Sequence, residues 1–399
     1  MDVPLVCYAC GATASLGDGE RCDCGEPYWV DTDPGGFAWP DGRDGSVWRY
    51  RDLLPVDPPV GLGASVGGTP LVRAPRLDAD VGARIHVKFE GAHPTGTFKD
   101  RGSAVGVAGA LAAGADAVGT VSHGNMARSM AAHAASEGLD CVVLVPADIP
   151  TERLELIARH DPTILRVGGS YGDLYHEALR VGREHDVAFV NSDTPLRVAG
   201  QKTTGLEVAE SFAPDAPDAV VMPVSSGGHA SGVWKAFREL DAAGAIPRVP
   251  RLYLTQAAPC APIADADAAG RDEVTAVEGG ETVCYSIANA DPPSGTRALR
   301  GARETGGAAV AVPDEETLDA RASVAEAAGL FVETSCATPL AGARRLAAEG
   351  EFAPDEDVVL VATGTGYTER AVDAPTVDAR TVSMADLGGA VRDAVGGTE

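Results

Sequence analysis

Short apolar stretches alternate with longer helical stretches along most of the chain, and glycine-bearing turns separate them. Residues 85–90 alternate apolar and polar side chains as a strand does, and residues 103–113 are small residues that favour a packed helix. The same order recurs further on, with strands predicted at 117–121, 141–145, 219–224 and 357–362 and helices at 126–137, 151–159 and 230–240. Strands that alternate with helices predict parallel sheets covered on both faces, with ligands at the carboxyl ends of the strands.

Four turns that follow predicted strands carry residues suited to ligand binding. They contain Lys99; Ser122 with Asn125; the run Ser225, Ser226, Gly227, Gly228 and His229; and Thr363. Because the carboxyl ends of parallel strands meet at one edge of a sheet, we expect these turns to gather at one cleft.

Lys99 stands in a turn rich in glycine and threonine, at the predicted start of a helix, where the helix N-terminus stabilises nearby negative charge. An amine held there can attack the aldehyde of a cofactor. The plain alternative is an ion pair with Glu90 or Asp100 on a solvated turn. The chain has only four lysines, Lys88, Lys99, Lys202 and Lys235, so each position is informative.

The run from Ser225 to His229 follows a buried strand and opens a helix. Its two glycines leave consecutive backbone N–H groups unobstructed, which is the arrangement of a phosphate cradle. A glycine pair that merely turns the chain is the alternative. At the next turn, Asn125 capping its own helix is a common structural role.

Four of the eight cysteines crowd into the first 25 residues, as Cys7, Cys10, Cys22 and Cys24. The spacing C-x2-C-x11-C-x-C, with a glycine after each pair, suits two tight turns that present four thiolates to a zinc ion. Reduced pairs or disulfides are the alternatives. A four-thiolate zinc has no open position for water, so we expect it to fold the module and to lie away from catalysis.

The formal net charge of −26 and the pI of about 4.6 exclude a general affinity for nucleic acid or an anionic membrane. An acidic excess with scarce lysine is typical of a halophilic protein in a salt-rich interior, where ions screen the charge. Neither a membrane-length apolar stretch nor a charged-then-apolar leader is found, so we expect a cytoplasmic protein.

The segment His93-Pro94-Thr95-Gly96-Thr97-Phe98-Lys99-Asp100-Arg101-Gly102 resembles the cofactor-lysine motif of the fold type II pyridoxal-phosphate (PLP) enzymes, and among them the threonine synthases most. The resemblance implies a tryptophan synthase β-like α/β fold with two parallel-sheet lobes, here with a small N-terminal zinc ribbon. It implies that Lys99 binds PLP covalently, Asn125 bonds the ring hydroxyl oxygen, and Thr363 faces the pyridine nitrogen. The phosphate would lie on Ser225, Ser226, Gly227, Gly228 and His229.

Residues 191–203 resemble the threonine synthase segment that lines the site of the substrate phosphate, which assigns Asn191, Ser192 and Arg197 to the substrate, with Ser122 nearby. Arginine suits a phosphate because its planar fork donates two hydrogen bonds at once. An ordinary ion pair in an acid-rich protein is the alternative for Arg197. The expected reaction converts O-phospho-L-homoserine and water into L-threonine and phosphate.

His123, Met126 and His229 depart from the family pattern near the substrate end, and Cys336, in a stretch that otherwise follows the family order, stands where serine is commoner. Two other functions therefore stay open. One is a different PLP lyase or synthase on the same scaffold, similar to a cysteate synthase or a threonine/serine dehydratase. The other is a PLP-binding regulatory protein.

The chain is divided as follows: zinc ribbon 1–30, irregular connector 31–66, first lobe with the PLP lysine 67–190, second lobe with the phosphate loop 191–370, and an unassigned tail 371–399. We expect a small amino-acid substrate and a homodimer, with no nucleic-acid or membrane partner.

Overall fold

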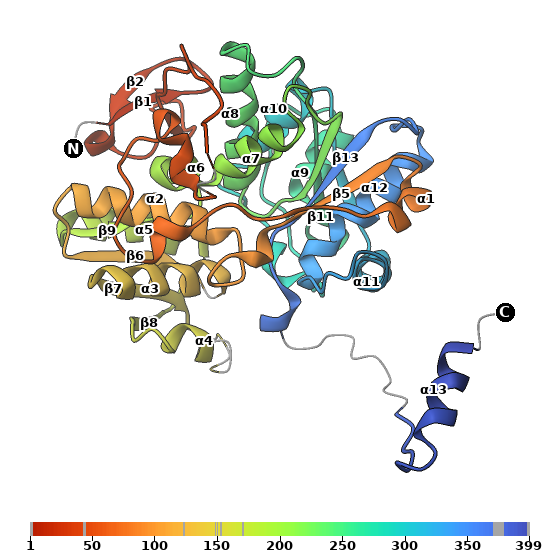
Figure 1. Cartoon of the computed structure of the whole chain (residues 1–399). Coiled ribbons are helices and arrows are strands. Elements are labelled where there is room, and N and C mark those ends of the chain that lie inside the picture. Colours follow the sequence, from red (N-terminus) through yellow and green to blue (C-terminus); the bar gives the residue numbers. More distant parts are fainter. Residues whose placement is uncertain are drawn as a thin grey trace. The chain divides into compact units, whose positions relative to one another are not determined.

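Two parallel sheets and one small antiparallel sheet organise the chain (Figure 1). The structure, a computed structural model, describes residues 3–42, 45–122, 124–147, 149, 151, 154–169, 171–369 and 379–396. Residues up to Glu369 belong to one unit, and residues from Arg370 onward belong to a second.

The N-terminal sheet is the expected ribbon, with strand order β2-β1-β3 and antiparallel pairing throughout. Its strands are β1 (Pro4–Cys7), β2 (Thr13–Ser15) and β3 (Tyr28–Val30). The connector that follows is irregular, as predicted, apart from short 3-10 turns such as Val47–Leu53. Trp48, Tyr50 and Leu53 of that turn are buried, so the connector is packed on the body.

The smaller parallel sheet has the order β8-β7-β6-β9, from β6 (Ala117–Val121), β7 (Asp140–Pro146), β8 (Thr163–Val167) and β9 (Val187–Phe189). Its helices are α2 (Lys99–Ala112), α3 (Asn125–Glu137), α4 (Glu155–Ala158) and α5 (Tyr171–Glu184). Val143 and Val145 pack with α2 and α3, whereas Leu144 packs with α5, because successive strand residues face opposite sides. Both faces are therefore covered.

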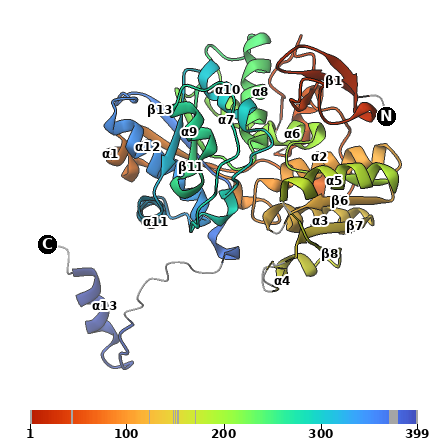
Figure 2. The ribbon, with the colours of Figure 1, turned by 180° about the vertical axis from the view of Figure 1, so that it is seen from behind.

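The larger sheet has the order β12-β11-β10-β13-β5-β4, and only β4 is antiparallel. Figure 2 shows this part of the chain from behind, with β11 and β13 labelled. Its strands are β4 (Leu71–Arg73), β5 (Arg84–Phe89), β10 (Ala219–Pro223), β11 (Arg251–Ala257), β12 (Ala309–Val312) and β13 (Asp357–Ala362). The associated helices are α1 (Asp78–Val81), α7 (Thr203–Phe212), α8 (Gly228–Ala242), α9 (Pro262–Ala268), α10 (Gly295–Glu304), α11 (Asp314–Ser323) and α12 (Thr338–Ala348). Leu360 packs with α11 and α12 and Val359 with α7 and α8, so this sheet too is buried on both sides.

The proposed division at residue 190 does not separate the two sheets. Strands β4 and β5, placed in the first lobe, pair in the larger sheet, and β5 runs beside β13 from Arg84 to Phe89. The chain then crosses to the smaller sheet through α2. Periodicity identifies a strand but carries no information about its neighbour, which is why the sequence prediction was wrong on this point.

The predicted strands and helices otherwise correspond closely to the observed ones. The main difference is the helix predicted over 151–159, of which only α4 (Glu155–Ala158) is helical in the described residues. Between the lobes, α6 (Pro195–Gln201) packs against α2, α8 and β3.

Within the second unit, the described residues form α13 (Leu387–Gly396) after a short turn. Residues 371–378 and 397–399 of the tail proposed at 371–399 lie outside the described residues, and the role of the tail stays unassigned. Among the helices that the structure describes, none has both the length and the apolar composition of a membrane span.

Candidate active site

Lys99 is the first residue of α2 and sits at the carboxyl ends of two adjacent parallel strands, β5 and β13. The turn before it is bonded to the turn after β13, because the Phe98 N–H donates to the Thr363 carbonyl at 2.9 Å and the Thr97 hydroxyl to the same oxygen at 3.2 Å. The Ser225 loop follows β10, the other neighbour of β13. Three of the four predicted turns therefore meet at this sheet edge.

The Lys99 ammonium has no hydrogen-bond or carboxylate partner among the described residues, and it lies 4.3 Å from the centre of the Phe98 ring. Lys88, Lys202 and Lys235 each pair with a buried glutamate, at Glu207 or Glu239. The alternative for Lys99, an ion pair with Glu90 or Asp100, does not occur. Glu90 is bound by Arg101, and Asp100 accepts hydrogen bonds from Thr95 and Ser129.

The environment of Lys99 favours a neutral, nucleophilic amine. Desolvation and, to a smaller extent, the positive charge of Arg197 lower its pKa to about 7 against the opposing effect of Glu333. An amine with a pKa near neutrality can act both as a nucleophile and as a proton carrier.

This pKa predicts how Lys99 reactivity depends on pH. In the protein without cofactor, trace acetylation of Lys99 should rise about tenfold per pH unit below about 7 and level off above it, because only the neutral amine reacts. Peptide mass spectrometry follows the labelling, with the buried, ion-paired Lys88 as an internal control. The Arg197→Leu variant should have a higher midpoint, since a nearby positive charge is lost. A midpoint near that of free lysine, at about 10.4, would contradict this assignment.

A buried ionic network fixes the start of α2. The Arg101 guanidinium donates to Glu90 at 2.6 and 2.8 Å and to Glu207 at 2.7 Å through each of two nitrogens. Lys88 adds a 2.7 Å contact to Glu207, and Thr69 bonds both Glu90 and Arg101. Paired in this way, the charges stabilise one geometry, whereas removal of one partner would leave an uncompensated buried charge. The network thus holds the neighbouring Lys99 in place.

The loop from Ser225 to His229 provides free backbone donors at the N-terminus of α8. The N–H groups of these five residues donate to no acceptor in the described part of the chain. Gly227 has a φ of 88°, and a Cβ there would lie 2.3 Å from the Ser294 carbonyl oxygen. A Cβ on Gly228 would lie 2.4 Å from the Ser192 carbonyl oxygen, so both positions require glycine. The loop has the donors and the space to hold a phosphate.

His229 lines the same loop as a neutral ring. It stacks on Phe98 with ring centres 4.0 Å apart and planes 13° apart, and its Nε2 lies 2.9 Å from the Thr204 hydroxyl. Burial lowers its pKa to about 3. Its Nδ1 is buried without a partner among the described residues, which leaves one polar atom of the cleft for a ligand.

Asn125 faces Glu333, a residue that the sequence prediction did not assign to the site. The Asn125 amide nitrogen lies 2.8 Å from each Glu333 carboxylate oxygen, and its amide oxygen accepts a 3.1 Å hydrogen bond from Arg128. A Cβ on Gly364 would lie 2.6 Å from the Glu333 carboxylate. Burial raises the pKa of Glu333, so the group carries its charge at some cost. The only signal in the sequence was its place in a short stretch of the family order.

Thr363 points toward Cys336. The Cys336 sulfur lies 3.1 Å from the Thr363 hydroxyl, and burial raises the pKa of its thiol well above the usual value. The neutral hydroxyl and the neutral thiol provide no charged partner for a ring nitrogen.

The predicted substrate residues differ in their burial and in their hydrogen-bond partners. Arg197 is fully buried beside Lys99, with its guanidinium 3.5 Å from both the Lys99 carbonyl and the Ser103 hydroxyl. The Ser192 hydroxyl is buried and has no partner in the described residues. Asn191 instead accepts from the Val121 N–H at 2.9 Å and donates to the Tyr175 carbonyl at 3.3 Å, and therefore braces the end of β6. The Ser122 hydroxyl accepts from the Gly124 N–H at 3.3 Å.

Of the residues that depart from the family pattern, His123 lies outside the described residues. Met126 is buried in α3. The effect of these two residues on the substrate end of the site therefore stays a prediction.

Residues 63–364 match the family described as pyridoxal-phosphate dependent enzyme. The chain belongs to the pyridoxal-phosphate-dependent enzymes. A threonine synthase of Methanocaldococcus jannaschii is 35% identical over 82% of each chain, and one of Methanosarcina acetivorans is 37% identical over 80% of this chain and 79% of the relative. The solved structure of maize serine racemase superposes with a TM-score of 0.63 over 82% of this chain and 93% of that chain, at 21% identity. That likeness shows the fold.

The residues of the cleft fit the cofactor of a pyridoxal-phosphate-dependent enzyme. The cofactor needs an amine for its aldehyde, donors for its phosphate and neutral or polar contacts for its ring. The amine is that of Lys99, and the phosphate donors are the unpaired N–H groups of the loop at Gly227. The ring contacts are Thr363 and Asn125. The unpartnered Nδ1 of His229 is a further polar atom beside this loop.

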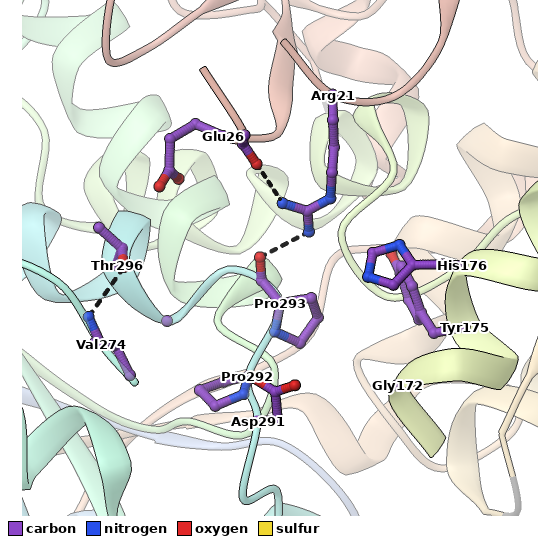
Figure 3. Close-up of a pocket in the computed structure, with 12 residues that line it drawn as sticks. Arg21, Glu26, Gly172, Tyr175, His176, Val274, Asp291, Pro292, Pro293 and Thr296 are labelled. Carbon is purple, nitrogen blue, oxygen red and sulfur yellow. Dashed lines mark hydrogen bonds between the residues drawn. The ribbon is translucent and has the colours of Figure 1, made fainter. Parts of the chain in front are cut away.

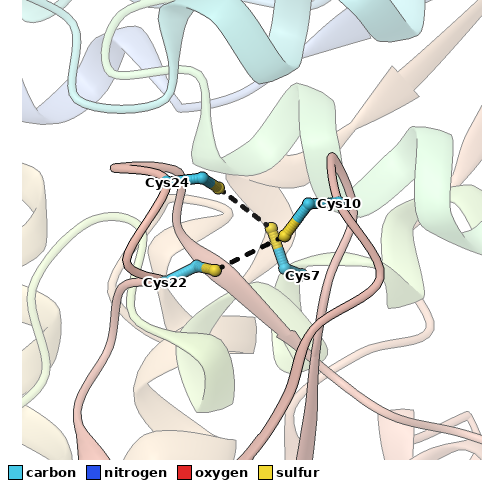
Figure 4. A group of neighbouring side chains, drawn as sticks. All are labelled: Cys7, Cys10, Cys22 and Cys24. Carbon is cyan, nitrogen blue, oxygen red and sulfur yellow. Dashed lines mark hydrogen bonds between the residues drawn. The ribbon is translucent and has the colours of Figure 1, made fainter.

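The four N-terminal cysteines converge as predicted (Figure 4). Their sulfur atoms all lie within 4.8 Å of one another, with Cys7 3.6 Å from Cys24 and Cys10 3.6 Å from Cys22. Sulfurs around a tetrahedral zinc with bonds of about 2.3 Å would be separated by about 3.8 Å. The observed distances are too long for disulfides, whose bond is about 2.05 Å.

The ribbon contacts the body beside a predicted substrate residue, and the remoteness of the cysteine site from catalysis stays a prediction. Arg21, one residue before Cys22, donates to Asp193 at 2.9 Å and to the Pro293 carbonyl at 2.8 Å. Asp193 directly follows Ser192. No local pattern reveals this contact, because the two residues are 172 positions apart.

Proposed function

We propose that this protein is a threonine synthase, which converts O-phospho-L-homoserine and water into L-threonine and phosphate. Threonine synthases at 35–37% identity over about four-fifths of the chain support the proposal. The observation that carries the choice of substrate is the position of Arg197, a buried guanidinium whose charge acts directly on Lys99. Its planar fork can donate two hydrogen bonds at once to a phosphate, which favours a phosphorylated substrate.

Bound pyridoxal phosphate supplies the electron delocalisation that stabilises negative charge at the substrate carbons. Lys99 holds the cofactor and, once the substrate has displaced it, carries protons from Cα and Cβ as base and acid. A pKa of about 7 suits both roles, because the amine exchanges protons readily near neutral pH. The network around Arg101 keeps the start of α2 from shifting during these transfers.

Arg197 binds the phosphate that leaves from Cγ, assisted by the buried hydroxyl of Ser192. The bond from Cγ to oxygen breaks with the electron pair leaving on phosphate, and water then adds at Cβ. A guanidinium already buried in the cleft needs little reorganisation to stabilise the departing dianion. Asn191 and Ser122 hold the backbone at this end of the cleft by accepting hydrogen bonds from backbone N–H groups.

The remaining contacts orient the cofactor. Thr363 would offer the pyridine nitrogen a neutral hydroxyl, which would leave that nitrogen unprotonated and the ring a mild electron acceptor. Asn125 would offer the ring hydroxyl its amide, which in this structure contacts Glu333. The N–H groups of Ser225, Ser226, Gly227, Gly228 and His229 take the cofactor phosphate.

A panel of substrates tests the proposed function. Full-length protein at high salt is incubated with O-phosphohomoserine, and in parallel with serine and with threonine, while phosphate, threonine and oxo acids are measured. The proposal expects threonine and phosphate from the first substrate and little oxo acid from the others. Oxo acid as the main product would favour a dehydratase, and no turnover of any substrate would favour a regulatory protein.

We further propose that Cys7, Cys10, Cys22 and Cys24 bind one structural zinc. The arrangement of the sulfurs supports a closed site, and metal binding would stabilise a module with little core of its own. Elemental analysis should therefore find about one zinc per chain, and Cys10→Ser with Cys24→Ser should lose it and lower the melting temperature. Protein without zinc whose four thiols are oxidised would contradict this proposal.

The acidic surface supports a halophilic protein of the cytoplasm, and an amino-acid substrate without nucleic-acid or membrane partners is consistent with that surface. A homodimer stays a prediction.

A further inference from the structure

Arg21 reaches from the ribbon into the body of the enzyme. One guanidinium nitrogen donates to the Gly25 carbonyl at 2.9 Å within the ribbon, and the other donates to Asp193 and to the Pro293 carbonyl. Figure 3 shows the hydrogen bond to Pro293. A pocket of about 320 Å³ opens beside it, lined by the ribbon, α5 and residues 291–296. Arg21 thus joins three separate segments of the chain.

The Asp193 carboxylate accepts hydrogen bonds from several segments of the chain. It is buried, it accepts hydrogen bonds from the Tyr175 hydroxyl and from the Ser294 hydroxyl at 3.0 Å, and it forms the ion pair with Arg21. Ser294 is in turn bonded to the glycine loop, because its N–H donates to the Ser226 carbonyl at 2.9 Å. Asp193 therefore fixes the residues on both sides of that loop.

The glycine loop is enclosed by the two residues that Asp193 holds. Gly227 lies against the carbonyl of Ser294, and Gly228 lies against the carbonyl of Ser192, each so closely that a Cβ would overlap the oxygen. A shift of the Ser294 or the Ser192 backbone would change the direction of the loop N–H groups that face a phosphate. Arg21 contacts Asp193, which is bonded to Ser294 and directly follows Ser192 in the chain. Only the Asp193 side chain therefore separates Arg21 from the residues on both sides of the loop.

The turn that carries the second cysteine pair also holds Arg21. The Gly25 N–H donates to the Cys22 carbonyl at 2.8 Å, the Cys22 N–H to the Glu26 carbonyl at 2.9 Å, and Arg21 forms a β-bridge with Pro27. The backbone of Arg21 is therefore set by the same turn that presents Cys22 and Cys24.

We propose that Arg21 is a positioning residue, through which the cysteine ribbon fixes the phosphate-binding loop of the active site. Arg21 touches no reacting atom and acts through Asp193. The inference rests on the assignment of the glycine loop to the cofactor phosphate and does not depend on which amino acid is the substrate.

Two cofactor forms separate this role from a general effect on folding. Full-length protein freed of cofactor is titrated with pyridoxal phosphate and with pyridoxal, which lacks the phosphate, and each dissociation constant is measured from the absorbance change. The ratio of the two constants reports the loop alone, because Lys99 condenses with both compounds. Arg21→Gln should weaken pyridoxal phosphate roughly tenfold, on the order expected for one charge-assisted contact, and leave pyridoxal nearly unchanged.

Arg183→Gln is the matched control. Arg183 also joins the ribbon to the body, through an exposed 3.1 Å ion pair with Glu20, but it does not contact Asp193. This variant should keep the wild-type ratio. If Arg21→Gln does not fold, Asp193→Asn tests the same link, and where both fold their effects on the ratio should be less than additive because they share one contact. Equal weakening of both compounds, or an unchanged ratio in Arg21→Gln and Asp193→Asn, would overturn the proposal.

Discussion

Replacement of Lys99 by alanine is expected to abolish covalent attachment of pyridoxal phosphate and to lower turnover by at least ~10²–10⁴-fold, the range for loss of a general acid–base group. The physical reason is that the amine supplies both the attachment and the proton transfers. Some cofactor should still bind, because the N–H groups of the loop from Ser225 to His229 remain. Visible absorbance measures binding, and borohydride reduction with peptide mass spectrometry locates the attachment.

Lys235→Gln is the control for this variant. Lys235 is also nearly buried, but it pairs with Glu239 in α8 and lies outside the cleft. Its replacement should preserve the reduced adduct on Lys99. An adduct on Lys88, Lys202 or Lys235 in the unmodified protein would refute the site.

Arg197→Leu is expected to lower kcat/KM for O-phosphohomoserine. The fall should correspond to a loss of about 2–4 kcal/mol in transition-state stabilisation, because a buried, charge-assisted contact with the phosphate is lost. Cofactor binding, followed by absorbance, should stay unchanged, because Arg197 is not among the residues proposed to hold the cofactor. Steady-state kinetics give the first quantity and spectra give the second. Arg197→Lys should recover part of the loss, as a point charge without the planar fork. Near-normal turnover of O-phosphohomoserine by Arg197→Leu would favour a different substrate.

Local patterns predicted the parts of this structure that depend on local physics. Alternation at residues 85–90 indicated a strand, small residues after Lys99 indicated a helix, and both occur as β5 and α2. Glycines at positions 227 and 228 predicted unobstructed backbone N–H groups, and these groups donate to no acceptor among the described residues. The resemblance of residues 93–102 to PLP enzymes was confirmed by the family match over residues 63–364.

Long-range pairing was not predictable in this way. The partner of β5 is β13, more than 260 residues further along the chain, so the boundary between lobes could not follow from periodicity. Glu333 contacts Asn125 across 208 residues, and its place in a short stretch of the family order does not reveal this contact. The ion pair of Arg21 with Asp193 has the same origin. The roles of individual site residues stay predictions until variants are measured.

The most direct test of the threonine synthase proposal follows the oxygen atoms. Full-length protein is incubated with O-phosphohomoserine in water enriched in ¹⁸O, and the label is located in the products by mass spectrometry. Loss of phosphate by carbon–oxygen cleavage at Cγ, followed by addition of water at Cβ, predicts equal amounts of threonine and phosphate, with ¹⁸O in the threonine hydroxyl and none in the phosphate. Homoserine with ¹⁸O in the phosphate, or no product at all, would contradict the account.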